Sequence, residues 1–310
     1  MKSIVFICHG RLWWKHKLSK VIEQVFADDF SCTILYTIDK GHAHRIVKDY
    51  INNGYKYFVV VGGDGLLNEV VNGMMAVGAD ALEILEGIRL GIWPKGSGND
   101  FSKTIGSSKD LNHLRHLIIN DFYVPCDIGH LRYHDSAGGR KEGYFINIAD
   151  IGLGGLVAKL IDKMPKFLHP GLAYQLAILI ALFQYRHKRV SISMNNSDAT
   201  VSDIMALIIA NGQYFGSGLG IAPEAHPSDG QFNVVKIGSI GLRDYIAQIK
   251  NIKQSRILDH PEVFYYTCYN LHVESLTESL PIDVDGEYYG ETPLEVRMLH
   301  RILPIWSDMA

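Results

Sequence analysis

The residues best suited to chemistry in this chain surround one aspartate. Asp64 stands within the glycine-rich stretch Gly62–Gly65, after the β-branched run Val59–Val61 and before apolar residues at helical spacing from Leu67. A strand that ends in a bare-backbone turn and opens a helix aims unpaired N–H groups at the turn, which suits a phosphate. A carboxylate repels a phosphate unless a cation bridges them or the carboxylate holds a donor. We therefore expect a polyphosphate with a divalent metal here, although Asp-Gly alone is also typical of a hairpin.

A second loop of this kind follows the strand-like run Leu90–Trp93. It consists of Lys95, Gly96, Ser97, Gly98 and Asn99. The glycines let the backbone approach a ligand, Ser97 and Asn99 add side-chain hydrogen bonds, and Lys95 suits a phosphate. The alternative is a solvent loop in which Asn99 or Asp100 caps a helix. A second glycine loop at the same expected sheet edge favours the binding interpretation.

An acidic segment lies far downstream, with Asp283, Asp285 and Glu287 at alternate positions. If the segment is extended, these side chains share one face, and paired carboxylates suit metal binding or proton abstraction. A surface hairpin with Asp285-Gly286 at its tip and solvated acids would explain the same spacing. Spacing alone leaves both interpretations open.

Two further segments have more than one interpretation. The glycine-rich loop Asn211–Leu219 leads to Asp229, which could bind a cation or shape a turn. The apolar run Leu172–Phe183 is followed by four basic residues at 186–189. It could be a lipid-facing helix with a basic collar, or a core helix whose C-terminus is capped by cations.

The first 128 residues alternate strand and helix, which predicts an α/β domain with a mostly parallel sheet. Ligands of such sheets bind at the carboxyl ends of the strands, where both glycine loops fall. The expected strands are Ser3–Cys8, Ser31–Tyr36, Tyr57–Val61 and Leu90–Trp93, and the expected helices are Lys17–Ala27, Ala43–Asn52, Leu67–Met75 and Leu111–Asn120.

Residues 129–310 are dominated by short β-rich runs, including Tyr144–Ala149 and Asp203–Ala210, and predict a β-rich, sandwich-like second domain. We place the domain boundary near residue 128 and allow the last ~15 residues to pack on the first domain. Exposed strand edges in the second domain would allow a homodimer.

Composition excludes several classes. The formal net charge of -3 gives no reason to expect a nucleic-acid partner, and the four cysteines lack metal-site spacing. The scattered cysteines, the absence of a signal peptide and apolar runs too short to span a bilayer predict a cytoplasmic protein with only peripheral membrane contact. The P-loop fingerprint is missing, and Val157 breaks a dinucleotide fingerprint that starts at Gly152.

Taken in order, these motifs resemble the diacylglycerol kinase catalytic-domain family, particularly the soluble bacterial lipid kinases, over nearly the whole chain. Sphingosine kinases are relatives and NAD kinases distant ones. The resemblance rests on Gly62–Gly65 with Asn68-Glu69-Val70 and Asn72-Gly73, Pro94–Phe101, Asn211–Gly218 with Pro223 and Asp229-Gly230, and Asp285-Gly286-Glu287.

The resemblance implies an ATP- and Mg²⁺-dependent kinase that transfers the γ-phosphate to a lipid hydroxyl, such as that of diacylglycerol, at the membrane surface. It implies that Asp285 is the general base, with Glu287 beside it. The implied nucleotide-binding residues are Gly62, Gly63, Asp64, Gly65 and the second glycine loop. The implied catalytic Mg²⁺ network is Asp64, Asp100 and Asp127, and the implied structural Mg²⁺ site is His226, Asp229 and Gln231.

The chain departs from the family pattern at two places. Leu66 stands where the family has Thr or Ser, and the first loop, His9–Lys15, lacks the usual Asn-Pro and carries Trp13-Trp14. These departures motivate an alternative, a non-catalytic relative that binds nucleotide or lipid. NAD kinase activity is a further alternative within the same chemistry.

Overall fold

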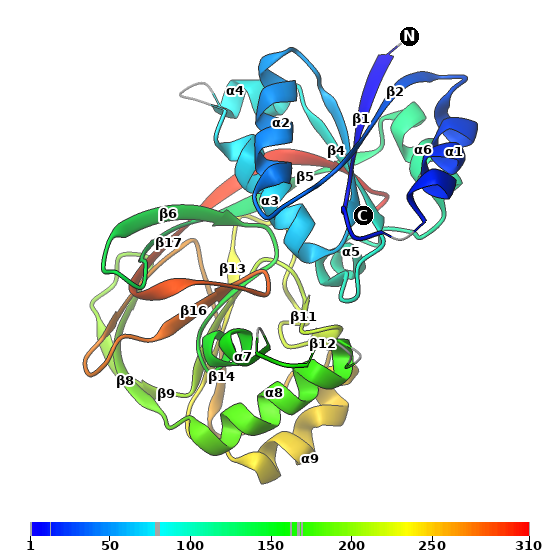
Figure 1. Cartoon of the computed structure of the whole chain (residues 1–310). Helices are drawn as coiled ribbons and strands as arrows, with labels where there is room; N and C mark the ends of the chain where they lie inside the picture. The colour runs from blue at the N-terminus through cyan, green and yellow to red at the C-terminus, as the bar shows by residue number, and fades with distance from the viewer. Residues whose placement is uncertain are drawn as a thin grey trace. The chain divides into compact units, whose positions relative to one another are not determined.

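The computed structural model describes residues 2–12, 14–77, 81–161, 163–165, 168 and 170–309. The chain forms two compact units (Figure 1). The first contains Met1–Asp127 and His300–Ala310, and the second contains Ile128–Leu299.

The first unit is built on a parallel sheet with strand order β2-β1-β3-β4-β17. The strands are β1 (Lys2–Cys8), β2 (Phe30–Tyr36), β3 (Tyr57–Gly62), β4 (Arg89–Pro94) and the end of β17 (Glu287–Trp306). Both faces of the central strands are buried, since Val5 and Phe6 are each fully inaccessible. Strands covered on both sides read as continuous apolar runs, which is why this sheet was predictable.

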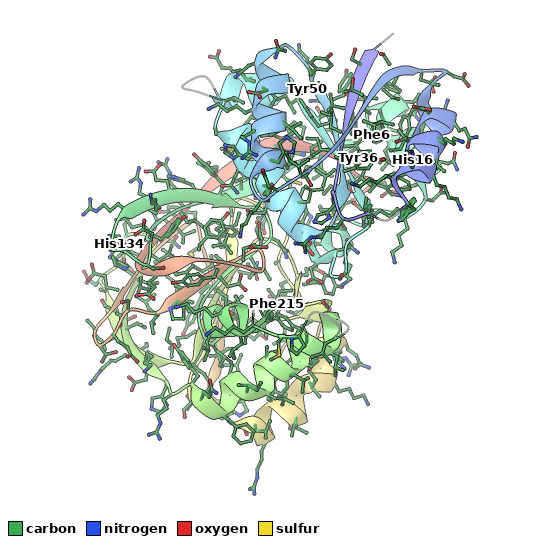
Figure 2. The ribbon with its side chains drawn as sticks, in the orientation of Figure 1. Phe6, His16, Tyr36, Tyr50, His134 and Phe215 are labelled. Carbon is green, nitrogen blue, oxygen red and sulfur yellow. The ribbon has the colours of Figure 1, made fainter. Side chains whose placement is uncertain are left out.

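Helices cover both faces of this sheet (Figure 1). They are α1 (Lys15–Phe26), α2 (His42–Asn52), α3 (Asp64–Met75), α4 (Ala81–Glu86), α5 (Asp100–Thr104) and α6 (Leu111–Asn120). Phe6, labelled in Figure 2, belongs to the core that the sheet forms with α1 and α6. Helices α2 and α3 pack together on the opposite face.

The second unit is β-rich and carries three helices among its described residues. Its strands are most of β5 (Tyr123–His134), β6 (Arg140–Phe145), β7 (Ile148–Gly152), β8 (Lys188–Met194), β9 (Thr200–Ile204), β10 (Ala206–Ala210), β11 (Tyr214–Phe215), β12 (Leu219–Gly220), β13 (Phe232–Ile237), β14 (Val263–Cys268), β15 (Asn270–Ser275), β16 (Pro281–Val284) and most of β17. The helices are α7 (Leu153–Ile161), α8 (Pro170–Gln184) and α9 (Leu242–Lys253).

This unit has layers that meet at two apolar cores. The antiparallel sheet β14-β13-β10-β7-β16 presents one face to strands β8, β15 and β17, and Ala149 and Ile151 lie in that core. The opposite face, with Ile148 and Ile208, packs against α7, α8 and α9. The predicted fold class, a mostly parallel α/β domain followed by a β-rich sandwich-like domain, is confirmed.

Two segments that were predicted as single strands are each divided between two strands. The run Tyr144–Ala149 is divided between β6 and β7, because the N–H groups of residues 146–148 bond a distant carboxylate instead of a neighbouring strand. The run Asp203–Ala210 is divided at Met205, where the chain leaves the pairing with β8 and enters the pairing with β13 and β7.

Helix α8 covers the apolar run Leu172–Phe183. Within the described part of the chain, no helix is long and apolar enough to cross a bilayer.

Candidate active site

The two glycine loops meet at the carboxyl ends of β3 and β4, which are parallel neighbours. The carbonyl oxygen of Gly62 accepts hydrogen bonds from the N–H groups of Lys95, at 2.8 Å, and Gly96, at 3.0 Å. The backbones approach so closely that a Cβ on Gly96 would lie 2.3 Å from the Cα of Gly63. Side chains at these positions would force the loops apart, so glycine is needed for the contact.

Asp64 joins the same two loops through its side chain. Its Oδ1 accepts the N–H of Asp100 at 2.8 Å and that of Phe101 at 3.2 Å. These are the first N–H groups of α5, and Asn99 before them has a φ of 53° and makes no side-chain cap. Asp64 therefore supplies the acceptor that a helix start requires. The Asp64 carboxylate thus accepts hydrogen bonds from two backbone donors. This is one of the two conditions under which we expect a carboxylate in a phosphate-type loop, the other being a bridging cation.

Helix α3 begins at Asp64, three residues before the predicted start at Leu67. Its N-terminal N–H groups and positive dipole end therefore lie in the glycine loop itself. Leu66 is buried on the first turn, and a Cβ on Gly62 would lie 2.6 Å from its Cδ2. At the position where the resemblance predicts a hydroxyl, this chain has an apolar side chain that packs over Gly62.

A second carboxylate lies beside Asp64. Asp100 is buried and pairs with Lys103 at 2.8 Å. Asp64 Oδ2 and Asp100 Oδ2 would lie 2.9 Å and 3.3 Å from a Cβ on Gly98, so both carboxylates border the same glycine. Burial, and then the charge of Asp100, raise the pKa of Asp64. The two neighbouring carboxylates repel each other, and their oxygens are the kind of ligand that a divalent cation such as Mg²⁺ prefers.

Asp127, the third residue of the predicted magnesium network, has other partners. It is fully buried, and its Oδ1 accepts the Arg301 N–H at 2.6 Å and lies 2.8 Å from His300 Nδ1. Among the described residues, no three His, Cys, Asp or Glu side chains are grouped closely enough to hold one metal ion. The structure thus brings Asp64 and Asp100 together without gathering a complete protein ligand set.

The other residues of the second loop have distinct surroundings. Asn99 is buried and binds its own loop, accepting the Gly96 N–H and donating to the Gly96 carbonyl. Ser97 is exposed. The Lys95 ammonium lies 4.1 Å from the ring centre of Trp93 and 5.7 Å from that of Trp14. Trp14 thus helps to position Lys95 in this chain, while Trp13 lies outside the described residues.

In the second unit, Asp285 is a buried carboxylate in a hairpin turn. Asp285 and Gly286 have φ values of 51° and 88°, which suits a tight two-residue turn between β16 and β17. Its oxygens accept the N–H groups of Ile146, Asn147 and Ile148 at 3.0 to 3.1 Å. The hairpin interpretation was therefore right about the turn and wrong about solvation.

The predicted common face of the three acids does not form, because the turn at Asp285 ends the extended segment. Asp283 pairs with Tyr288 across the hairpin, and Glu287 pairs with Val284. Glu287 is only partly exposed and directly follows the turn, with Gly286 between it and Asp285.

The structure brings together two buried carboxyls, Asp150 and Asp283, which the sequence did not predict as a pair. Asp150 on β7 lies opposite Asp283 on β16, and cross-strand partners point to the same face. Both have an Oδ1 without a hydrogen-bond partner, as does the nearby Tyr185 hydroxyl. Burial raises the pKa of each carboxyl well above its ordinary value, and for Asp283 the charge of Asp150 adds to this. The sequence feature that could have indicated this pair is Asp150, an acid inside the apolar run Ile148–Ile151.

Asp150 also lines an apolar cavity between the sheet and the three helices. The cavity has a volume of about 90 Å³. Its walls include Val157 of α7, Ile178 of α8 and Phe215, which is labelled in Figure 2. Its lining is mostly aliphatic and aromatic, so it suits an alkyl chain more than a polar ligand.

The predicted structural magnesium loop forms a turn. Asp229 Oδ1 accepts the Gln231 N–H at 2.9 Å, and the His226 carbonyl accepts the Ser228 N–H at 2.9 Å. Gly230 has a φ of 80°, which closes the turn. These contacts agree with the turn-shaping role of Asp229, and a cation at this loop stays a prediction.

The contact of Asp64 with α5 predicts a local loss when it is removed. Asp64→Ala leaves the N–H groups of Asp100 and Phe101 without their acceptor, which costs about 1–3 kcal/mol of unfolding free energy. Urea denaturation measures the cost, and hydrogen exchange should accelerate at these two amides. Asp110→Ala, which removes an exposed side-chain cap of α6, is the matched control. Unchanged exchange at Asp100 and Phe101 in the Asp64 variant would refute the role.

The buried Asp150 predicts a pH dependence of stability. A carboxyl whose pKa is raised by folding stabilises the folded state at acid pH, and this contribution is lost as pH rises above about 4, the unfolded value. Asp150→Asn should therefore raise the free energy of unfolding, measured by urea denaturation, at about pH 8 and change it little at about pH 4. Asp198→Asn, at an exposed position, is the control. A loss of stability at about pH 8 would contradict the assignment.

Family models match both parts of the chain. Residues 5–131 match the diacylglycerol kinase catalytic domain, and residues 147–307 match the YegS C-terminal NAD kinase beta sandwich-like domain. A diacylglycerol kinase from Staphylococcus carnosus (strain TM300) is 24% identical over 302 residues, which covers 96% of this chain and 92% of that protein. A probable YegS-like lipid kinase from Alcanivorax borkumensis is 24% identical over 309 residues, covering 98% and 96%.

A solved structure shows the same fold. The crystal structure of a putative diacylglycerol kinase from Bacillus anthracis str. Sterne has a TM-score of 0.76 with this chain at 21% identity, covering 99% of this chain and 97% of that one. The C-terminal model alone spans half of the sequence, and the N-terminal model covers the glycine loops. The chain therefore belongs to the diacylglycerol kinase family, whose relatives include the YegS-like lipid kinases.

Proposed function

We propose that this chain transfers the γ-phosphate of ATP to the hydroxyl of a lipid alcohol such as diacylglycerol. The observation that carries the proposal is the joining of the two glycine loops by Asp64 at the start of α3. Helix starts of this kind bind phosphate, and the relatives reported above are named diacylglycerol kinase or lipid kinase.

In this proposal the first unit holds the nucleotide. The residues are Gly62, Gly63, Asp64 and Gly65 of the first loop and Lys95, Gly96, Ser97, Gly98 and Asn99 of the second. The first turn of α3 offers N–H groups to the phosphates. Asn99 fixes the conformation of the second loop through hydrogen bonds to both the N–H and the carbonyl of Gly96. Lys95 adds positive charge at the same sheet edge. Leu66 contributes packing over Gly62 in place of a hydroxyl contact.

Asp64 and Asp100 would hold Mg²⁺, with the phosphates and water completing its coordination. When bound, this ion neutralises charge on the transferred phosphoryl group. The raised pKa of Asp64 supports the assignment, because a cation relieves the repulsion between the two carboxylates. Asp127 would act at a distance, by fixing His300 and Arg301.

The second unit offers a place for the lipid acceptor. The apolar lining of the cavity suits part of an alkyl chain, and the carboxyl of Asp150 is one of the polar groups in its wall. Asp150 lies two residues along β7 from Ile148, whose N–H bonds Asp285. At a rise of about 3.3 Å per residue, Asp150 lies roughly 7 Å along the strand from Ile148. A hydroxyl next to a chain in the cavity would thus lie near Asp285.

In the transfer step, the lipid oxygen attacks the γ-phosphorus as the bond from that phosphorus to the β,γ-bridging oxygen breaks. ADP leaves, and Asp285 accepts the proton of the hydroxyl. Three backbone N–H groups fix the Asp285 carboxylate, so its orientation toward an acceptor needs no rearrangement. A strong base is unnecessary, because the proton leaves late in a loose transition state. Glu287 adds negative charge beside this carboxylate.

A survey of products tests the function and the acceptor site together. The purified chain, incubated with ATP, Mg²⁺ and a total lipid extract, should form phosphorylated lipids that mass spectrometry detects. Val157→Phe narrows the cavity and should shift the products toward shorter chains, because a long chain then clashes with the ring. Val201→Phe, at an exposed strand position, should leave the profile unchanged. ATP binding without any phosphorylated lipid would favour the non-catalytic alternative.

Asp285→Asn tests the proposed base. We expect the initial rate at saturating substrates to fall by about 100-fold or more, because an amide cannot take the proton. The variant should also lose about 1–3 kcal/mol of stability, since an amide matches three N–H donors poorly. Asp135→Asn is the control, because its carboxylate also accepts backbone N–H groups in a turn, those of Ala137 and Gly139. A folded Asp285→Asn protein with nearly wild-type turnover would remove this residue from the mechanism.

A further inference from the structure

Helix α8 exposes apolar side chains along its whole outward face. Leu172, Leu176 and Phe183 are 52%, 36% and 77% exposed, and their spacings of four and seven residues place them on one side of the helix. Its inward face carries Ala177 and Ile178, which are buried. Residues 170–184 contain no charged side chain. A helix that is apolar all round in a folded protein requires an apolar partner on its outer side.

Helix α9 lies beside α8 (Figure 1). The Tyr245 hydroxyl of α9 donates to Gln175 Oε1 of α8 at 2.9 Å, so the two helices are in direct contact. Ile246 is 60% exposed. Three exposed cations share its side of α9 at helical spacing: Arg243, Lys250 and Lys253. The apolar face of α8 is thus bordered by a helix face that carries positive charge.

The charge of this surface is one-sided. Arg186 and Arg189 follow the C-terminal end of α8, and residues 170–189 contain no acid. Residues 241–257 contain a single acid, Asp244, which caps α9 through the Gly241 N–H. In the described part of the chain, Lys188 pairs with Glu278, whereas Arg186, Arg189 and the α9 cations form no salt bridge. An apolar stripe with unpaired cations beside it is complementary to an anionic surface with an apolar interior.

We infer that the outward faces of α8 and α9 dock on a bilayer that contains anionic lipid. The apolar side chains of α8 enter the acyl boundary, and the cations contact the headgroups. A second copy of this chain fits less well, because a two-fold interface would place the same cations opposite each other. Ile178 and Leu182 on the inner side of α8 line the apolar cavity, so the docked helix lies between membrane and cavity. The inference deepens the proposed function, but vesicle binding can be measured without any kinase activity.

Vesicle co-sedimentation of the full chain tests this surface. We expect binding to phosphatidylcholine vesicles that contain phosphatidylglycerol, weaker binding as salt rises, and little binding to pure phosphatidylcholine. Lys250→Glu with Lys253→Glu should weaken binding by at least about 30-fold. The matched control is Lys17→Glu with Lys20→Glu, which changes the net charge equally, with the same spacing, on exposed positions of α1. Equal weakening by both pairs would show a global charge effect and overturn the proposal.

A second pair of variants tests the apolar half. Leu172→Gln with Phe183→Gln should weaken binding to the anionic vesicles by roughly tenfold or more, because two exposed side chains no longer enter the acyl boundary. Val201→Gln with Leu276→Gln removes side chains of similar exposure elsewhere in the unit and should have no effect. The proposal is overturned if the wild-type chain fails to bind anionic vesicles. It is also overturned if the α8 variants leave vesicle binding intact while converting a dimer to a monomer in sedimentation velocity.

Discussion

The hydrogen bonds from the first N–H groups of α5 to the Asp64 carboxylate are the contact on which the first unit's site depends. They connect the turn after β3 with the turn after β4, and the closely packed glycines Gly63 and Gly96 fix the spacing. Without this acceptor, α5 would begin with unpaired donors, because Asn99 turns its side chain back to Gly96. One carboxylate thus joins the two loops at this edge of the sheet, and its second oxygen borders Asp100 at Gly98.

The second unit shows how surroundings divide the roles of similar acids. Asp285 accepts three backbone N–H groups, so burial costs it little and its orientation is fixed. Asp150 and Asp283 are buried with unpaired oxygens, so they favour the protonated form. A neutral carboxyl can donate a hydrogen bond to a hydroxyl oxygen, while an ionised one can accept its proton. The unit therefore contains one carboxylate with three backbone donors and two carboxyls that favour the neutral form.

The sequence predicts local structure where local physics decides it. The β-branched run Val59–Val61 and the helical spacing after it identify β3 and α3, and right-handed crossovers then place both glycine loops at one edge. The early start of α3 was not predictable, because Gly and Asp favour helices weakly and only the contact with α5 holds them there. The break in Tyr144–Ala149 was also hidden, since its cause is Asp285, well over 100 residues away in the chain. The sequence of α8 is apolar on every side, so it could not predict which face of the helix is exposed.

The central claim is phosphoryl transfer from ATP to a lipid hydroxyl, and one reaction tests it directly. The purified chain is given ATP labelled in the γ-phosphate, Mg²⁺, the lipid extract and NAD together, and the label is followed into lipid, NADP and inorganic phosphate. The account predicts that the label enters the organic phase in a lipid phosphomonoester. Label that remains in ATP while ATP binds tightly, or label that appears in NADP, would contradict it.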